Sequence, residues 1–200
     1  MVAEKGNPIF HIDLDPQQNI KNKAFFKNLL KEIVESSNEN LEKKLEKFYH
    51  KDAELNAFYP VNEIKGIGEI KNKLWDPLKR AFADLEIRNN IVIGGAYKDK
   101  IFVSFVSHLT GTFINQWLGV PPTNKTIYLR TCHCHQITNN KIIKSYILID
   151  TVDFIRQAGY WPLHKSSGIE GMWPAPITGD GENHNNLDKK LSIKFPQITF

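Results

Sequence analysis

The stretch from residue 111 to residue 159 constrains the fold more than any other part of this 200-residue chain. Two long runs of alternating apolar and polar residues, 126–138 and 141–150, are separated only by Asn139 and Asn140. Asparagine tolerates the positive φ that two-residue hairpin turns require. The stretch therefore predicts a long antiparallel hairpin, followed by an exit from the second strand into a helix.

The turn also predicts the pairing within this hairpin. Counting outward from a Thr138–Lys141 pair places four residues of each strand opposite each other on one face: His135 with Lys144, His133 with Tyr146, Thr131 with Leu148, and Leu129 with Asp150. The other face then carries the remaining residues: Arg130, Cys132, Cys134 and Gln136 against Ile143, Ser145, Ile147 and Ile149. Both faces are mixed in polarity, so the pattern alone does not identify the concave face.

Helices are predicted in the N-terminal part of the chain. Apolar residues at helical spacing predict a helix over 19–35, a second helix after a break at 36–38, and a third over 67–83. Pro77 lies inside the third pattern and should kink or restart it. Short alternating runs predict further strands around 52–57, 87–93 and 101–105, the last two joined by a turn.

Composition limits the class of protein. With 41% apolar and 24% charged residues, the chain can bury one sizeable core, which we assign to 17–160, with an N-terminal extension (1–16) and a Gly/Pro-rich C-terminal tail (161–200). No membrane-spanning or secretory segment is visible, so we expect a cytoplasmic protein. The net charge of +4 is small and its charges are interspersed, which indicates no nucleic-acid partner. The only two cysteines, Cys132 and Cys134, share a strand face and favour a reducing compartment.

Several residues of the chain occur in the same order and at the same spacing as the motif residues of one known family. They are Gly111–Thr112, the run 118–123, Lys125, Arg130, Lys141–Ile142, Tyr146, Asp150, Gln157 and Gly159. With them the chain resembles the SnoaL-like polyketide cyclases, which are related to nuclear-transport-factor-like proteins and ketosteroid isomerases. The resemblance implies an α+β fold, a cone-shaped barrel in which N-terminal helices close a curved antiparallel sheet over one pocket.

The resemblance also implies a reaction and a catalytic residue. It implies acid/base chemistry on a small carbonyl compound without a cofactor, such as cyclisation or isomerisation, with Asp150 as the acid/base group and its face of the hairpin as the concave one. A carboxylate in a dry pocket suits such chemistry because desolvation raises its pKa. The alternative is that Asp150 only ends the strand and caps the helix that begins at Thr151.

Six other residues are candidates for the same site. His133 is predicted to help catalysis, beside Tyr146, by bonding a substrate oxygen or tuning Asp150; the alternative is a strand histidine at the surface or in the core. The predicted substrate-binding residues are Tyr146, His108, Trp117, Trp75 and Phe105. His133 and His135 form a His-x-His pair, but no third ligand accompanies them, so no metal is predicted.

Two further functions stay open at this stage. The fold could serve as a binding module that keeps the pocket and lacks catalysis, or as an interaction protein that pairs through the outer face of its sheet. We expect the partners to be a small apolar or carbonyl-containing molecule and a second copy in a homodimer, with neither nucleic acid nor membrane.

Overall fold

The computed structural model describes residues 16–161 and residue 164. Its helical segments are α1 (Pro16–Glu35), α2 (Leu41–Phe48), α3 (Ile67–Ile70), a π-helical turn (Lys71–Trp75), α4 (Asp76–Ala81) and α5 (Thr151–Gln157). Its strands are β1 (Tyr49–Ala57), β2 (Glu63–Lys65), β3 (Phe82–Tyr97), β4 (Lys100–Phe113), β5 (Thr126–Thr138) and β6 (Lys141–Ile149). None of the helices in these ranges has the length and apolar character needed to cross a membrane.

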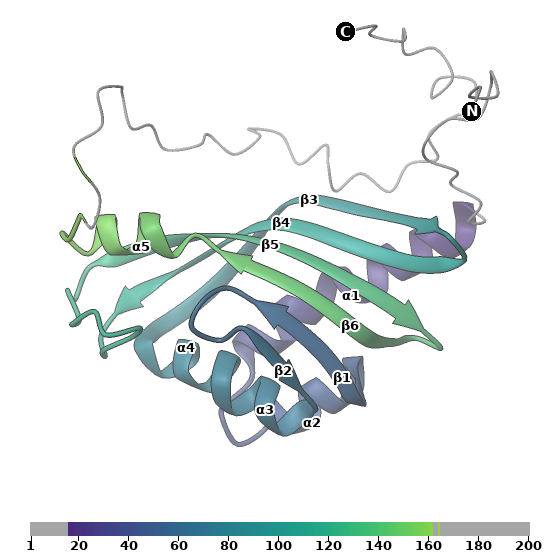
Figure 1. Ribbon diagram of the computed structural model, residues 1–200, viewed down its shortest axis with the longest axis horizontal. Coiled ribbons are helices and arrows are strands. Elements are labelled where there is room, and N and C mark those ends of the chain that lie inside the picture. Colours follow the sequence, from purple (N-terminus) through teal and green to yellow (C-terminus); the bar gives the residue numbers. More distant parts are fainter. Residues whose placement is uncertain (1–15, 162–163, 165–200) are drawn as a thin grey trace, which may run out of the picture.

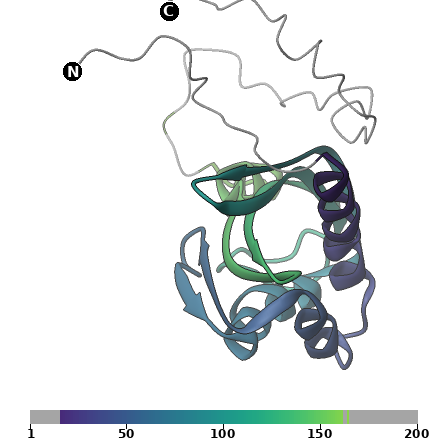
Figure 2. The same ribbon diagram turned by 90° about the vertical axis from the view of Figure 1, so that its right-hand side faces the viewer.

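The six strands form one curved sheet in the order β2-β1-β6-β5-β4-β3. Neighbouring strands are antiparallel except β1 and β6, which are parallel. Figures 1 and 2 show the sheet curling around the helices, with α1 along one side and α2 to α4 beneath. The predicted α+β fold is confirmed, and the sheet stays open between its edge strands β2 and β3.

The first helix packs closely against the long strand β3. Its apolar stripe, which includes Phe26, Leu29 and Ile33, is fully buried. At its other end the Asn19 side chain donates a hydrogen bond to the carbonyl oxygen of Gly94, at 3.0 Å. A Cβ atom at residue 94 would collide with the Asn19 side chain, so glycine is what allows this close approach.

The third predicted helix is present, but its geometry changes along its length. A π-helical turn ends at Trp75, two residues before Pro77, and α4 then continues to Ala81, so the helix ends two residues earlier than predicted. Proline lacks the N–H that a regular helix would use, and a widened turn is one way to accommodate that loss. Lys79 then anchors this helix to α1, because its amine donates hydrogen bonds to the carbonyls of Val34 and, at 3.0 and 2.7 Å, of Ile33 and Ser36.

The predicted hairpin is confirmed, but its register is not. The turn residues Asn139 and Asn140 have φ of 50° and 57°, as the turn requires. A β-bulge follows: Ile137 pairs with Ile142, while Gln136 pairs with Lys144, which leaves Ile143 unpaired. The predicted pairs beyond the turn are therefore wrong by one residue of β6.

This bulge decides which side chains face the helices. His133 lies opposite Ile147, and Tyr146 lies opposite Cys134. Because side chains alternate along a strand, a shift of one residue moves every β6 side chain to the other face. Of the residues predicted to share one face of the hairpin, those on β5, including His133, are buried on the concave side. Those on β6, including Tyr146 and Leu148, lie instead on the exposed outer face.

Candidate functional site

Four polar or amphipathic rings contact one another in a row beneath the concave face of the sheet. The indole of Trp75 lies nearly parallel to the His133 imidazole, with ring centroids 6.5 Å apart and planes 9° apart. The His133 and His135 rings follow at 5.8 Å, and the Tyr49 ring stands edge-on to His135 at 6.3 Å. All four side chains are at most 1% exposed, and we call them the interior cluster.

Separate parts of the chain deliver these rings. His133 and His135 are two residues apart on β5, so both point to the concave face. Tyr49 is the first residue of β1, and Trp75 ends the π-helical turn. Phe105 on β4 pairs with His133 and adds an apolar ring 5.8 Å from that of His135.

Several polar atoms of the interior cluster have no hydrogen-bond partner among the residues that the structure describes. They are both ring nitrogens of His133, Nε2 of His135, Nε1 of Trp75 and the hydroxyl oxygen of Tyr49. A buried polar group left unsatisfied costs roughly 1–3 kcal/mol, and native proteins rarely contain several together. Buried water or polar atoms of a bound molecule would be stabilised at this face, because either would supply the missing partners.

Burial keeps the interior cluster electrically neutral. Desolvation lowers the pKa of His133 to about 3. Desolvation also holds the pKa of His135 well below its usual value, and repulsion between the two imidazoles when both are protonated adds to this shift. Burial raises the pKa of the Tyr49 phenol, and the neighbouring hydroxyl of Ser145 acts in the opposite direction. At neutral pH each imidazole therefore offers one N–H donor and one acceptor nitrogen, while tyrosine and tryptophan offer donors.

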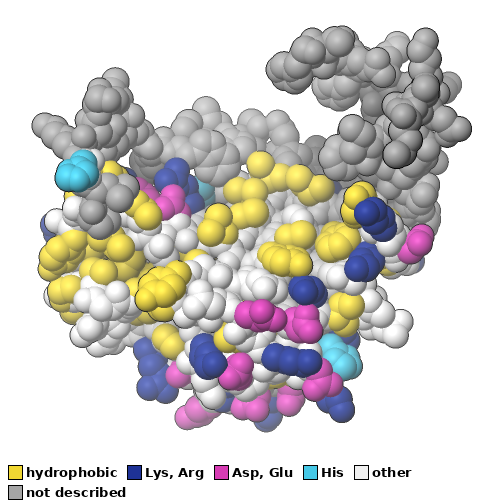
Figure 3. Space-filling model, in the orientation of Figure 1, with side chains coloured by type: hydrophobic (Ala, Val, Ile, Leu, Met, Phe, Trp, Pro, Cys, Tyr) yellow, Lys and Arg dark blue, Asp and Glu magenta, His cyan; other side chains and the backbone are white. Residues whose placement is uncertain are grey.

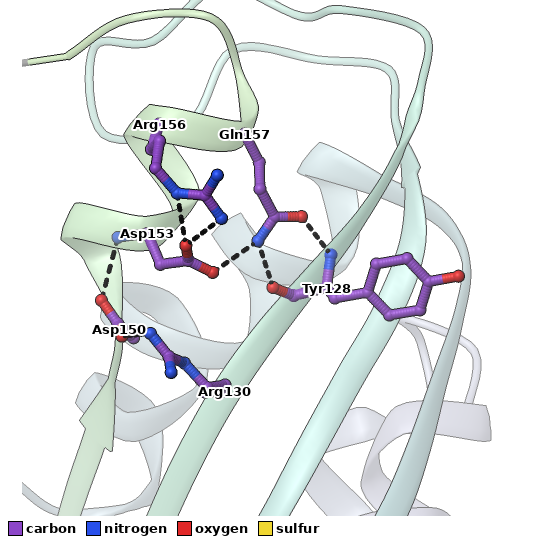
Figure 4. A network of polar contacts seen from close by, with 6 residues as sticks. All are labelled: Tyr128, Arg130, Asp150, Asp153, Arg156 and Gln157. Atoms are coloured by element: carbon purple, nitrogen blue, oxygen red, sulfur yellow. Dashed lines mark hydrogen bonds and ion pairs between the residues drawn. The ribbon is translucent and has the colours of Figure 1, made fainter. Parts of the chain in front are cut away.

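Asp150 lies in a different environment, at the junction of β6 and α5 (Figure 4). Its Oδ1 accepts a hydrogen bond from the backbone N–H of Asp153 at 2.9 Å, which caps the helix. Its Oδ2 lies 2.6 Å from Nη2 of Arg130, and 32% of the Asp150 side chain is exposed. The capping role considered for this residue is therefore present, accompanied by an ion pair.

The same network ties α5 to the sheet. The side-chain amide of Gln157 accepts from the backbone N–H of Tyr128 at 2.9 Å and donates to its carbonyl at 2.7 Å, much as a neighbouring strand would (Figure 4). Asp153 accepts from both Arg156 and Gln157. These contacts fix the helix near the start of β5, beyond the last pair of β5 with β6.

The structure brings some predicted site residues together and separates others. His133, Trp75 and Phe105 meet at the concave face. Tyr146 and His108 lie on the outer face, because Tyr146 follows the bulge and His108 pairs with Arg130. The prediction that His133 and Tyr146 lie side by side is therefore wrong, because the bulge shifts the register of β6 by one residue.

His108 and Trp117 are both predicted substrate-binding residues, and neither belongs to the interior cluster. Nδ1 of His108 lies 2.7 Å from the side-chain oxygen of Asn90, and burial followed by the charge of Arg130 lowers the pKa of this imidazole. Trp117 is 5% exposed and packs edge-on against the ring of Phe154, whose centroid lies 4.9 Å away. Trp117 therefore belongs to an aromatic part of the core.

Sequence reasoning gave no role to three residues of the interior. His135 and Ser145 were visible in the hairpin, and His135 shares the parity of His133, which is a usable signal. Ser145 interrupts a run of isoleucines, but its face depends on the bulge. Tyr49 carries no local signal, because only the parallel pairing of β1 with β6 brings it to this face.

A surface hollow of about 380 Å³ lies elsewhere, between the end of α1 and the start of β3. It is lined by residues 34–38 and 82–85 and by Lys79, and contains none of the predicted site residues. Within the described ranges, no three His, Cys, Asp or Glu side chains gather in a way that could hold a metal ion.

The comparisons with known proteins agree with this architecture. The sequence matches the family described as SnoaL-like polyketide cyclase over residues 27–158. No curated protein matches the chain significantly.

Similar solved structures carry the same fold at low identity. A candidate SnoaL-like polyketide cyclase from Jannaschia sp. CCS1 is 16% identical, with 78% of this chain and all of that chain covered and a TM-score of 0.59. AclR, a candidate hydroxylase from Streptomyces galilaeus, is 20% identical, with 68% and 97% covered and a TM-score of 0.53. IdmH, a candidate polyketide cyclase from Streptomyces antibioticus, is 15% identical, with 73% and 99% covered and a TM-score of 0.52. At these identities the likeness shows the fold alone.

Proposed function

Because the chain belongs to the SnoaL-like polyketide cyclase family, we propose that its interior binds a small carbonyl-containing molecule and rearranges it by acid/base chemistry, as a cyclase or isomerase that needs no cofactor. The observation that carries the proposal is the interior cluster, in which buried, neutral polar atoms of four side chains lack partners among the described residues. A carbonyl oxygen of a ligand would accept from the donors among them, and an enol O–H would donate to an acceptor nitrogen.

The donors of the interior cluster suit a developing oxyanion. The indole N–H of Trp75, next to His133, is a neutral donor in a desolvated interior, where hydrogen bonds to negative charge are strongest. When a proton leaves the carbon next to a carbonyl, the charge moves to that oxygen. Donors held next to it lower the energy of the enolate more than that of the ketone.

His133 is the residue that we propose to move the proton. Its ring nitrogens have no partner in the part of the chain that the structure describes, and the neutral imidazole carries one acceptor nitrogen. Negative charge forming on the substrate beside the ring favours the imidazolium, so proton transfer becomes easier as the reaction proceeds. Asp150 is the second candidate, which the family resemblance supplies, although Arg130 and the helix end engage its two oxygens.

Hydrogen–deuterium exchange at the carbon next to a ketone tests this proposal without knowledge of the product. The probe is 1-tetralone in D2O, followed by NMR, with the full chain, and binding is followed by quenching of tryptophan fluorescence. We expect the protein to accelerate exchange and His133→Gln to lose roughly 100-fold or more of that acceleration, the usual contribution of a general acid–base group. Asp150→Asn and the exposed-site control His164→Gln should keep most of it.

The other outcomes separate the alternatives. Loss of exchange in Asp150→Asn with full exchange in His133→Gln would assign the chemistry to the carboxylate and refute the role of His133. Binding of tetralone without accelerated exchange would support a binding module that lacks catalysis. If tetralone and its methoxy and hydroxy derivatives neither bind nor exchange faster than in buffer, the proposed function is wrong.

The outer face of the sheet favours a second candidate function, pairing with another copy of the chain. Cross-strand partners align two rows there: Tyr146, Cys134, Ser104 and Ile93, and next to it Leu148, Cys132, Val106 and Ile91. Ile93 and Leu148 are each 61% exposed, and Figure 3 shows hydrophobic side chains gathered over this part of the sheet. Exposed apolar patches of this kind mark interaction surfaces.

We propose a homodimer through this outer face, and light scattering tests it. The wild-type chain at about 50 µM should have the mass of a dimer, and the Ile93→Lys/Leu148→Lys double variant should be monomeric, because burying two unpaired ammonium groups opposes association. The matched control, Lys98→Glu at the exposed β3–β4 turn, should remain dimeric. A monomeric wild-type chain would refute this proposal.

A further inference from the structure

Three buried residues connect the interior cluster to the neighbouring strand. Ser145 on β6 lies opposite His135 on β5, and its Oγ is 2.7 Å from Nδ1 of that imidazole. Both side chains are completely buried. Tyr49, on β1, places its hydroxyl near Ser145, but the two groups do not reach full hydrogen-bond geometry. Nε2 of His135 has no partner among the described residues.

The Ser145–His135 hydrogen bond can run in either direction, and the choice fixes the tautomer of the imidazole. If Nδ1–H donates to Ser145, the serine proton must turn to the phenol oxygen of Tyr49, which is a weak acceptor. The Tyr49 proton and the Nε2 lone pair are then both left without partners in the interior. This direction leaves one strong donor and one strong acceptor without partners.

The opposite direction leaves fewer strong groups unmatched. Ser145 then donates to Nδ1, and its oxygen is free to accept from the Tyr49 phenol. A phenol is a better donor than an aliphatic hydroxyl, and an imidazole nitrogen is a better acceptor than either oxygen. Only the Nε2–H of His135 is left as an unmatched donor, which is the less costly arrangement in a buried site.

We propose that Ser145 holds His135 in the Nε2–H tautomer, so that His135 presents a fixed hydrogen-bond donor to the interior and acts as a binding residue for an acceptor oxygen of the ligand. The two imidazoles then have different roles. His133, whose nitrogens have no partner within residues 16–161, is free to adopt the tautomer with its acceptor toward the ligand, whereas His135 is committed as a donor. The site would select molecules with a carbonyl or enol oxygen and reject those that offer only N–H donors in its place.

The tautomer itself can be measured without any ligand. In the ¹⁵N-labelled full chain, long-range proton–nitrogen correlations distinguish a protonated ring nitrogen from an unprotonated one, and the His135→Gln variant assigns the signals. We expect unprotonated Nδ1 and protonated Nε2 for His135. Ser145→Ala should convert the signals to a mixture or to the other tautomer, and Tyr49→Phe should weaken the preference.

Ser107→Ala is the matched control, because Ser107 is an equally buried serine on the concave face but donates to Asn89. It should leave the His135 signals unchanged. A protonated Nδ1 in the wild-type chain would overturn the proposal, and so would an unchanged tautomer in Ser145→Ala. If Ser145→Ala fails to fold, the wild-type spectrum decides alone.

The role of His135 in binding rests on the proposed function and has its own readout. Ser145→Ala should weaken tetralone binding by about tenfold, the usual worth of one hydrogen bond, while Ser107→Ala binds normally. Unchanged affinity in Ser145→Ala would refute the binding role. If no ketone binds while the tautomer is as expected, the proposed function is wrong and the assignment of the tautomer stands.

Discussion

Acidification should destabilise this protein, and the part of the loss in unfolding free energy that His133 causes can be calculated. The folded state holds the pKa of His133 at about 3, because the imidazole is 1% exposed, whereas in an unfolded chain it titrates near 6.5. Below about pH 6.5 the unfolded state therefore binds one more proton than the folded state. The free energy of unfolding falls as pH decreases from 6.5 toward 3, by about 1.4 kcal/mol per pH unit for this residue.

Between about pH 7.5 and pH 5 the expected loss from His133 is about 2 kcal/mol. This figure depends mainly on the unfolded-state pKa, since a folded-state pKa anywhere below 4 gives nearly the same result in that window. Urea unfolding followed by tryptophan fluorescence, at both pH values, measures it in the wild-type chain and in His133→Gln. Titrating groups far from His133 contribute to both proteins and cancel in the difference. His135 is coupled to His133, but burial is the larger cause of its lowered pKa and persists in the variant, so most of its contribution cancels as well.

The wild-type chain should thus lose about 2 kcal/mol more than His133→Gln on acidification. His164→Gln is the control, because His164 is exposed, and this variant should lose as much stability as the wild-type chain. Equal losses in wild type and His133→Gln would mean that the imidazole is protonated, or open to water, in the folded state. That result would remove the neutral interior on which the proposed chemistry depends.

Three further predictions concern the frame around the interior, each measured by urea unfolding at neutral pH. Asp150→Ala should cost about 1–2 kcal/mol through loss of the helix cap, and Asp150→Asn less, because asparagine still caps; equal costs would contradict this. Lys79→Met should cost about 2–3 kcal/mol, because three carbonyls near the end of α1 lose a charged donor; a change within error would refute the anchor. Gly94→Ala should lower the free energy of unfolding by about 1–3 kcal/mol, and adding Asn19→Ala to this variant should recover most of the loss. Additive losses in the double variant would contradict a collision between the two side chains.

Local patterns predicted most of the fold. The three N-terminal helical segments and the long hairpin follow from periodicity, and Asn139–Asn140 supplied the turn that their φ values confirm. The bulge at Ile143 was not predicted, because an extra residue in one strand leaves composition and alternation almost unchanged. This extra residue turns the β6 side chains to the face opposite the predicted one. The residues around Tyr146 therefore differ from those expected.

The site was less accessible to sequence reasoning, since its members come from elements that only the folded chain brings together. His133 was found through the hairpin, and Trp75 was named as a candidate from the third helix. Tyr49 was missed, because its place beneath the sheet depends on the parallel pairing of β1 with β6 across about ninety residues of chain. Neither periodicity nor a local motif reports such a contact.

The residues that carry the family resemblance mostly secure the frame. A Cβ at Gly111 would lie 2.9 Å from the Ala83 carbonyl oxygen at a bulge of β3, and Lys141 donates to two carbonyls at the end of α2. Gln157 holds α5 to the backbone of β5. The buried imidazole of His133, in contrast, is outside the motif and faces the interior. Gly111, Lys141 and Gln157 of the motif therefore hold the frame around the interior, whereas the residue proposed to move the proton lies outside the motif. The proposed chemistry has to be tested at His133 and His135 themselves, with the motif residue Asp150 as the competing candidate.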